Sequence, residues 1–149
     1  MKVVYLHGWL SSPLSYKVQV LRENGFQVLA PELPAEDWGQ SVINARKAIK
    51  EFAPDVVVGS SRGGAVAMAS NKSIPAILIA PAWKKFCPWG TIAASTTIIH
   101  SPDDEVVAFD DSVELAHTFG AMLVEAGQNH RMQDDEAIGA ILEALNEYR

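Results

Sequence analysis

Two adjacent serines stand between an apolar run and a cluster of glycines, in the stretch VVVGSSRGGAVA. A serine on a sharp strand-to-helix turn requires small residues two positions before and two after it, because the backbone folds back on itself there. Ser61 has Gly59 and Gly63 at those positions, whereas Ser60 has a valine and an arginine. We therefore expect Ser61 to be a nucleophile on a G-x-S-x-G turn, with a helix N-terminus below it that favours developing negative charge.

A serine hydroxyl becomes a good nucleophile only when a base takes its proton. Of the four histidines, His130 lies in a loop after the last apolar run, where its side chain can reach over a strand edge. His117 falls within a helical pattern, and His7 and His100 end apolar runs that are followed closely by turn residues. We therefore expect His130 to be the base, although an exposed loop histidine is the simpler interpretation of that residue alone.

The base needs a carboxylate to orient its ring. Asp103, Asp104 and Glu105 follow the fifth apolar run and precede His130 in the chain. Taken alone, the two aspartates are also typical of a turn-capping pair. The chain order Ser, Asp, His with each residue at a strand end favours the catalytic interpretation, because this coincidence is improbable by chance.

Six short apolar runs must position these residues. They are rich in Val, Ile and Leu without alternating polar residues, which predicts strands buried on both faces. The runs are Lys2–Leu6, Gln27–Ala30, Asp55–Val58, Ala76–Ala80, Thr97–His100 and Ala121–Glu125. Helical spacing separates them, as over Trp38–Phe52 and in a last helix that Asp134 or Asp135 caps. This alternation predicts a parallel sheet between helices, with ligands bound beyond the carboxyl ends of the strands.

Length and composition narrow the class of protein. The 149 residues, 48% of them apolar, predict a single domain over 1–149. A net charge of −6 with scattered Lys and Arg argues against nucleic acid as the main partner. The single cysteine, Cys87, excludes an intramolecular disulfide and a Cys-rich zinc site. No apolar run suits a signal peptide or a membrane span, so we expect a cytoplasmic protein without a membrane partner. The oligomeric state stays open.

Several segments resemble the α/β-hydrolase superfamily, and in particular the small cap-less bacterial serine esterases of the YqiA-like kind. The segments are YLHGWLSSPLSYKVQ, GSSRGGAVA, ILIAPAWKKF, DDEVV and EAGQNH, so the resemblance covers nearly the whole chain. It implies an α/β fold in three layers, with helices on both faces of a six-stranded parallel sheet of order 2-1-3-4-5-6. This minimal hydrolase fold has no cap domain.

The resemblance also implies the role of each site residue. Ser61 would be the nucleophile, His130 the base and Asp104 the acid that orients it. When the segment DEVV is aligned with the family pattern, Asp104 occupies the position of the family's acid and Asp103 lies one position before it. Asp103 nevertheless stays as the alternative acid.

The resemblance further implies an oxyanion hole from the backbone N–H groups of Arg62 and Trp9. The segment PAWKKFCPWG is short where larger hydrolases carry a lid. We therefore expect Trp9, Trp83, Phe86 and Trp89 to line a shallow substrate pocket, or else to pack on the core. The Arg62 side chain could favour an anionic substrate, but we expect a salt bridge to a nearby carboxylate.

These residues predict a hydrolase that cleaves a small carboxylic ester or thioester through an acyl-enzyme. Its partner would be the small-molecule substrate, and the chemistry requires no metal or cofactor. Two other classes stay open: a module that binds a small ligand without turnover, and an interaction protein that keeps the fold as a scaffold. A complete triad favours the enzyme, because neither alternative requires Ser, Asp and His together.

Overall fold

A parallel sheet forms the centre of the protein. The computed structural model describes residues 1–9 and 11–149, and its six strands follow the order β2-β1-β3-β4-β5-β6 with every neighbouring pair parallel. The strands are β1 (Lys2–Leu6), β2 (Gln27–Leu29), β3 (Val56–Ser60), β4 (Ala76–Ile79), β5 (Thr96–His100) and β6 (Met122–Glu125). The predicted fold class and strand order are confirmed, and the predicted strand bounds shift by at most two residues.

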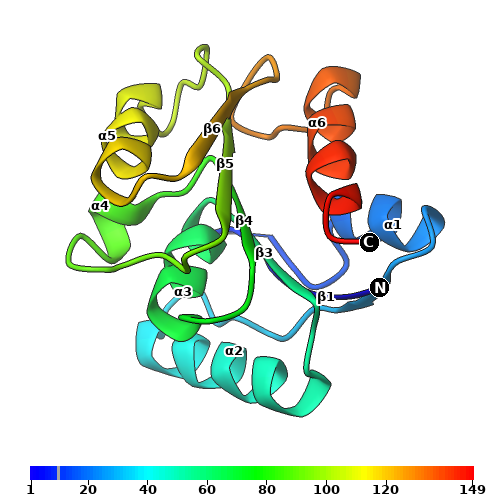
Figure 1. Ribbon diagram of the computed structural model, residues 1–149. Coiled ribbons are helices and arrows are strands. Elements are labelled where there is room, and N and C mark those ends of the chain that lie inside the picture. Colours follow the sequence, from blue (N-terminus) through cyan, green and yellow to red (C-terminus); the bar gives the residue numbers. More distant parts are fainter. Residues whose placement is uncertain (10) are drawn as a thin grey trace.

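Helices cover both faces of this sheet, which gives three layers (Figure 1). They are α1 (Tyr16–Glu23), α2 (Trp38–Phe52), α3 (Arg62–Ser70), α4 (Trp83–Phe86), α5 (Phe109–Phe119) and α6 (Asp135–Asn146). Helices α1 and α6 lie on one face, and α2, α3 and α5 lie on the other. Asp134 caps α6 by accepting a hydrogen bond from the Ala137 amide, as one of the two predicted caps. None of the helices described over 1–9 and 11–149 has the length and apolar character to cross a membrane.

Alternate residues of each strand belong to two separate hydrophobic clusters, one on each face of the sheet, because successive side chains of a strand point to opposite faces. In β3, Val56 and Val58 pack toward α1 and α6, whereas Val57 packs toward α2 and α3. The expectation of strands buried on both faces is wrong for β2 and β6, which are partly exposed. These two are edge strands and have a neighbour on one side only.

The parallel arrangement brings the candidate residues to one edge of the sheet. All strands point the same way, so the loops after β1, β3, β5 and β6 meet at their carboxyl ends. Ser61 follows β3 directly, Asp104 lies in the loop after β5, and His130 lies in the loop after β6. The sheet therefore carries these side chains to a common place from three separate segments.

Candidate active site

Ser61 stands on a strained turn between β3 and α3. Its φ of 56° and ψ of −117° lie outside the regions that residues with a side chain ordinarily adopt. A Cβ at Gly59 would lie 2.5 Å from the carbonyl oxygen of Gly63, and a Cβ at Gly63 would collide with the carbonyl oxygen of Leu6. Only glycine fits at both positions, so the local sequence permits the sharp turn that exposes Ser61.

A chain of hydrogen bonds joins Ser61, His130 and Asp104. Ser61 Oγ lies 2.9 Å from His130 Nε2, and His130 Nδ1 lies 2.7 Å from Asp104 Oδ2. The Asp104 side chain is fully buried, and the His130 side chain is 17% exposed. An ionised carboxylate can only accept hydrogen bonds, so Nδ1 carries the proton and Nε2 accepts from the Ser61 hydroxyl. This is the tautomer in which His130 can take a proton from Ser61.

Four donors surround the Asp104 carboxylate. Oδ1 accepts from the amides of Val106 and Val107 at 2.7 and 2.8 Å, and Oδ2 accepts from His130 and, at 3.0 Å, from His100 Nε2. Burial raises the pKa of the Asp104 carboxyl, but the hydrogen bonds lower it by more. The pKa therefore lies well below the ordinary value for aspartate, and Asp104 stays ionised at neutral pH.

His100 is a site residue that the sequence reasoning missed. It is fully buried at the end of β5, and its Nε2 donates to Asp104 while lying 3.1 Å from the Val107 carbonyl oxygen. Its Nδ1 lies 2.6 Å from Ser112 Oγ and accepts from that hydroxyl, since Nε2 already carries the proton. The signal in the sequence was a histidine that ends an otherwise apolar strand four residues before the acid.

Asp103 stands apart from this arrangement. Its side chain is exposed, and its amide donates to Ser101 Oγ at 3.0 Å. The structure brings Asp104 rather than Asp103 to the His130 ring. Glu105 contacts the backbone of the same loop, since its carboxylate accepts from the His130 amide at 3.4 Å.

The two amides predicted to form an oxyanion hole lie in segments that flank Ser61. Arg62 is the first residue of α3, and the first amides of a helix have no acceptor within the helix. Trp9 follows Gly8, where an added Cβ would lie only 3.2 Å from the Cβ of Ser61. The turn after β1 therefore packs closely against the nucleophile, as a donor from that turn requires.

The Arg62 side chain does not form the expected salt bridge, so that prediction was wrong. It is 1% exposed, and its Nη2 donates to the Pro34 carbonyl at 3.0 Å and to Ser41 Oγ at 3.1 Å. Within the described part of the chain, no carboxylate lies within ion-pair distance of it. Aromatic faces stabilise the guanidinium instead. Its central carbon lies 5.5 to 5.6 Å from the ring centres of Trp9, Trp38 and Phe86.

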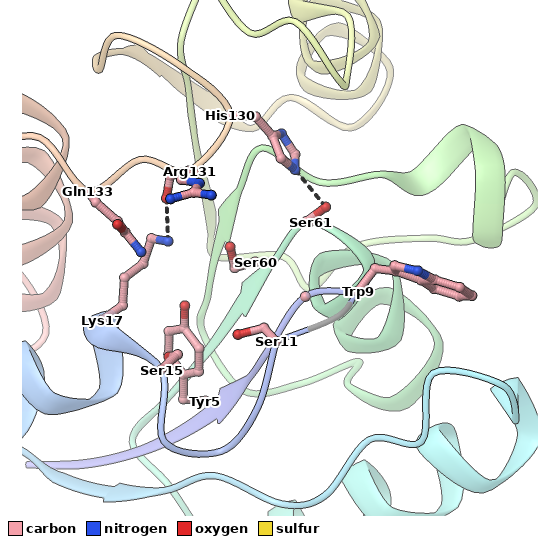
Figure 2. A pocket seen from close by; sticks show the side chains of 11 residues that line it. Tyr5, Trp9, Ser11, Ser15, Lys17, Ser60, Ser61, His130, Arg131 and Gln133 are labelled. Carbon is pink, nitrogen blue, oxygen red and sulfur yellow. Dashed lines mark hydrogen bonds between the residues drawn. The ribbon is translucent and has the colours of Figure 1, made fainter.

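Two cavities meet at Ser61, and Trp9 and His130 line both of them. The first, of about 530 Å³, is here called the apolar cavity. Its other lining residues are Ala82, Lys84, Lys85, Phe86, Val106, Val107, Ala108 and Asp111. The second, of about 400 Å³, is here called the polar cavity (Figure 2). Its other lining residues are Tyr5, Gly8, Ser11, Ser15, Lys17, Ser60, Arg131 and Gln133.

The four aromatic residues that were expected to line a pocket or to pack on the core lie in three different environments. Trp9 and Phe86 line the apolar cavity, with their rings stacked 5.8 Å apart. Trp83 is instead buried in the core, where its Nε1 donates to the Asp111 carbonyl at 2.9 Å. Trp89 is 76% exposed and lines a separate depression that does not include Ser61.

The arrangement can transfer a proton from a serine hydroxyl to an imidazole that an ionised carboxylate orients. That is the chemistry of nucleophilic attack on a carbonyl carbon. Over residues 1–9 and 11–149, no three His, Cys, Asp or Glu side chains are grouped so that they could hold a metal ion. The thiol of Cys87 is buried, which raises its pKa, and it lines neither cavity at Ser61.

Comparisons with known proteins identify the family of this chain. The sequence matches the model of the Alpha/beta hydrolase family over residues 3–144, and the chain therefore belongs to that family. The superfamily predicted from the sequence is confirmed. No curated protein matches the sequence significantly.

Solved structures share the fold over nearly the whole chain. A protein of the alpha/beta hydrolase superfamily from Xanthomonas campestris pv. campestris is 24% identical, with a TM-score of 0.74 over 98% of this chain and 96% of that one. The ydeN gene product from B. subtilis is 16% identical, with a TM-score of 0.73 over 99% and 97%. The esterase domain of a Rhodothermus marinus protein is 15% identical, with a TM-score of 0.68 over 99% and 84%. At these identities the likeness establishes the fold alone.

Proposed function

We propose that this chain is a serine hydrolase that cleaves a small carboxylic ester or thioester through an acyl-enzyme on Ser61. The observation that carries the proposal is the continuous hydrogen-bonded chain from Ser61 through His130 to Asp104. Membership of the alpha/beta hydrolase family supports hydrolysis, and an esterase domain stands among the proteins that share the fold.

The reaction would proceed in two halves. Ser61 Oγ attacks the substrate carbonyl carbon while its proton passes to His130 Nε2. The tetrahedral intermediate collapses, and the departing alcohol or thiol takes that proton from His130. A water molecule then gives a proton to His130 and attacks the acyl-enzyme, and Ser61 leaves with that proton as the free carboxylic acid forms.

Three features of the site would favour these steps. Ionised Asp104 fixes the His130 tautomer and stabilises the imidazolium that forms after attack. The backbone N–H groups of Arg62 and Trp9 would donate to the oxyanion, and removal of one such donor typically costs about 100-fold to 1000-fold in turnover. The strained backbone of Ser61 keeps the hydroxyl exposed at the junction of the two cavities.

A serine-directed fluorophosphonate probe tests the proposal, because it labels only an activated serine. We expect one label per chain, found on Ser61 by peptide mass spectrometry and lost in Ser61→Ala. Ser60→Ala is the matched control, since this neighbouring hydroxyl also lines the polar cavity and should leave labelling intact. Labelling that survives in Ser61→Ala, or no labelling of the intact protein, would overturn the assignment.

A panel of substrates then defines the bond that is cleaved. Esters, thioesters and amides of matched acyl groups are compared at several acyl lengths, each with the intact protein and with Ser61→Ala. We expect turnover of esters or thioesters that depends on Ser61. Failure to cleave any of them, together with no labelling, would favour a module that binds a ligand without turnover.

A further inference from the structure

Lys17 is a buried cation without a carboxylate partner. It is 8% exposed near the start of α1, and its ammonium donates a hydrogen bond to the carbonyl oxygen of Arg131 (Figure 2). Among the residues that the structure describes, no carboxylate lies within ion-pair distance of it. Burial lowers the pKa of Lys17 to about 8, because the charged form loses hydration. A charge held in this way costs free energy unless a further partner stabilises it.

The polar cavity into which Lys17 opens is suited to a negative charge. Its lining contains a second cation, Arg131, and five hydroxyl groups, but no Asp or Glu. The chain as a whole carries 18 acidic residues and a net charge of −6. A cavity lining without Asp or Glu is therefore unlike the composition of the chain. Burial raises the pKa of Tyr5 well above its usual range, so this phenol stays protonated and repels no anion. Ser15, the N-cap of α1, also lines the cavity, which adds the positive end of the helix dipole.

We propose that the polar cavity binds a carboxylate of the substrate, with Lys17 as its counter-ion. Ser61 and His130 line the same cavity, so a carboxylate held there belongs to the molecule whose carbonyl Ser61 attacks. The substrate is then an ester or thioester with one free carboxylate, on its acyl part or its alcohol part. Of the two cations in this lining, Lys17 is buried and Arg131 is exposed, and one buried ammonium matches a singly charged group better than a phosphate dianion. This inference rests on the proposed function and names its substrate class.

A purely structural role for Lys17 predicts a different result. The carbonyl that accepts its hydrogen bond belongs to Arg131, the residue after His130, so Lys17 also fixes the loop that carries the base. Loss of that support would lower turnover of every substrate alike. Loss of a counter-ion would lower turnover of the carboxylate substrate more than that of a neutral substrate of the same shape. The ratio of the two kcat/KM values therefore separates the two roles.

Two pairs of substrates measure this ratio. The mono-4-nitrophenyl ester of succinic acid is paired with 4-nitrophenyl succinamate, which changes the charge on the acyl part alone. The pair 4-acetoxybenzoate and 4-acetoxybenzamide changes the charge on the alcohol part alone. In at least one pair we expect the intact protein to prefer the carboxylate by tenfold or more, the worth of about 1.4 kcal/mol for a charge-assisted hydrogen bond.

Lys17→Met should lower that ratio by about tenfold, and Lys17→Arg should restore much of it because the charge returns. Lys85→Met is the matched control, since this lysine is exposed and lines the cavity on the other side of Ser61, and it should keep the ratio. No preference for the carboxylate in either pair would overturn the inference. An equal loss for both members of a pair in Lys17→Met would also overturn it and assign Lys17 to support of the loop.

Binding to the Ser61→Ala variant tests the cavity without turnover. Calorimetry compares 4-acetoxybenzoate with 4-acetoxybenzamide on Ser61→Ala and on Ser61→Ala with Lys17→Met. Tighter binding of the carboxylate that disappears with Lys17 supports this inference even if no ester is cleaved, in which case the proposed function alone fails. Turnover that depends on Ser61 but shows no preference for charge overturns this inference alone.

Discussion

The two cavities beside Ser61 each have a buried cation nearby, and the two cations are held differently. Arg62 lies behind the apolar cavity under the rings of Trp9 and Phe86, with hydrogen bonds to a carbonyl and a hydroxyl. Lys17 opens into the polar cavity and donates to one carbonyl. Neither has a carboxylate partner among the described residues.

This difference between Arg62 and Lys17 shows why one buried cation stabilises the fold while the other is available to a ligand. Three aromatic faces, one carbonyl and one hydroxyl surround the guanidinium of Arg62 inside the fold, and its side chain lines neither cavity at Ser61. Its Nε has no hydrogen-bond partner among the described residues. The charge of Lys17 is compensated only in part, since its ammonium donates to one carbonyl, and Lys17 lines a cavity that Ser61 also lines. A cation of the first kind stabilises the structure, whereas one of the second kind is available to a ligand.

The largest expected effect comes from the triad that both cavities share. Asp104→Asn should lower turnover of neutral and carboxylate esters alike, on the order of ten thousandfold. The side-chain amide of asparagine would donate a hydrogen bond to His130 Nδ1 instead of accepting one, which leaves His130 in the wrong tautomer to take a proton from Ser61. Steady-state kinetics on both substrates measure it. Asp103→Asn is the matched control and should cost little, since its side chain is exposed. A comparable loss of turnover in Asp103→Asn would mean that Asp103 is the acid that orients His130.

Ser61 and His130 should act as one unit. Ser61→Ala and His130→Ala should each cost roughly a thousandfold or more in kcat, and the double variant should cost little beyond either alone. Turnover of each class of ester by the three variants measures this coupling. Additive losses, or one class of ester that survives in His130→Ala, would mean that the two cavities do not share a single base.

The preference for a carboxylate should depend on pH through Lys17. Its pKa is lowered to about 8, so Lys17 is charged below that pH and loses its charge as the pH rises through it. The kcat/KM ratio of carboxylate to neutral ester should therefore fall between about pH 7 and pH 9.5, approaching the ratio in Lys17→Met. The other titratable groups that face it across the cavity are Tyr5, Arg131 and His130. In Lys17→Arg the ratio should stay constant over this range, and a parallel fall there would assign the pH dependence to another group.

The smallest expected effect concerns the apolar cavity. Phe86 is half-buried in its wall, so Phe86→Ala should lower kcat/KM for a 4-nitrophenyl hexanoate about fivefold relative to the acetate, the worth of roughly 1 kcal/mol of apolar contact. Trp89→Ala is the control, because this exposed ring lines neither cavity at Ser61. An equal loss in Trp89→Ala would contradict the division of the aromatic residues described above.

The sequence was sufficient for those parts of the protein that depend on neighbours along the chain. Runs of Val, Ile and Leu predicted the strands, and helical spacing predicted a helix near Trp38–Phe52, where α2 lies. The sharp turn at Ser61 was predicted from Gly59 and Gly63. Only Gly59 is limited by neighbours along the chain, because the atom that excludes a Cβ at Gly63 is the carbonyl oxygen of Leu6 in β1. The strand order and the choice of Asp104 came instead from a resemblance to a family. The structure brings Ser61, His130 and Asp104 together, and their catalytic roles stay predictions.

Only the tertiary structure decided which distant side chains meet. His100 shares the carboxylate of Asp104 with a histidine from another loop, and Arg62 meets aromatic rings from three segments instead of an acid. Lys17 and the carbonyl that it contacts are 114 residues apart in the chain. Such contacts depend on which strands are neighbours and on how the loops at their ends fold over one another. Periodicity and local spacing do not predict these long-range contacts, because they report only on residues within a few positions of each other.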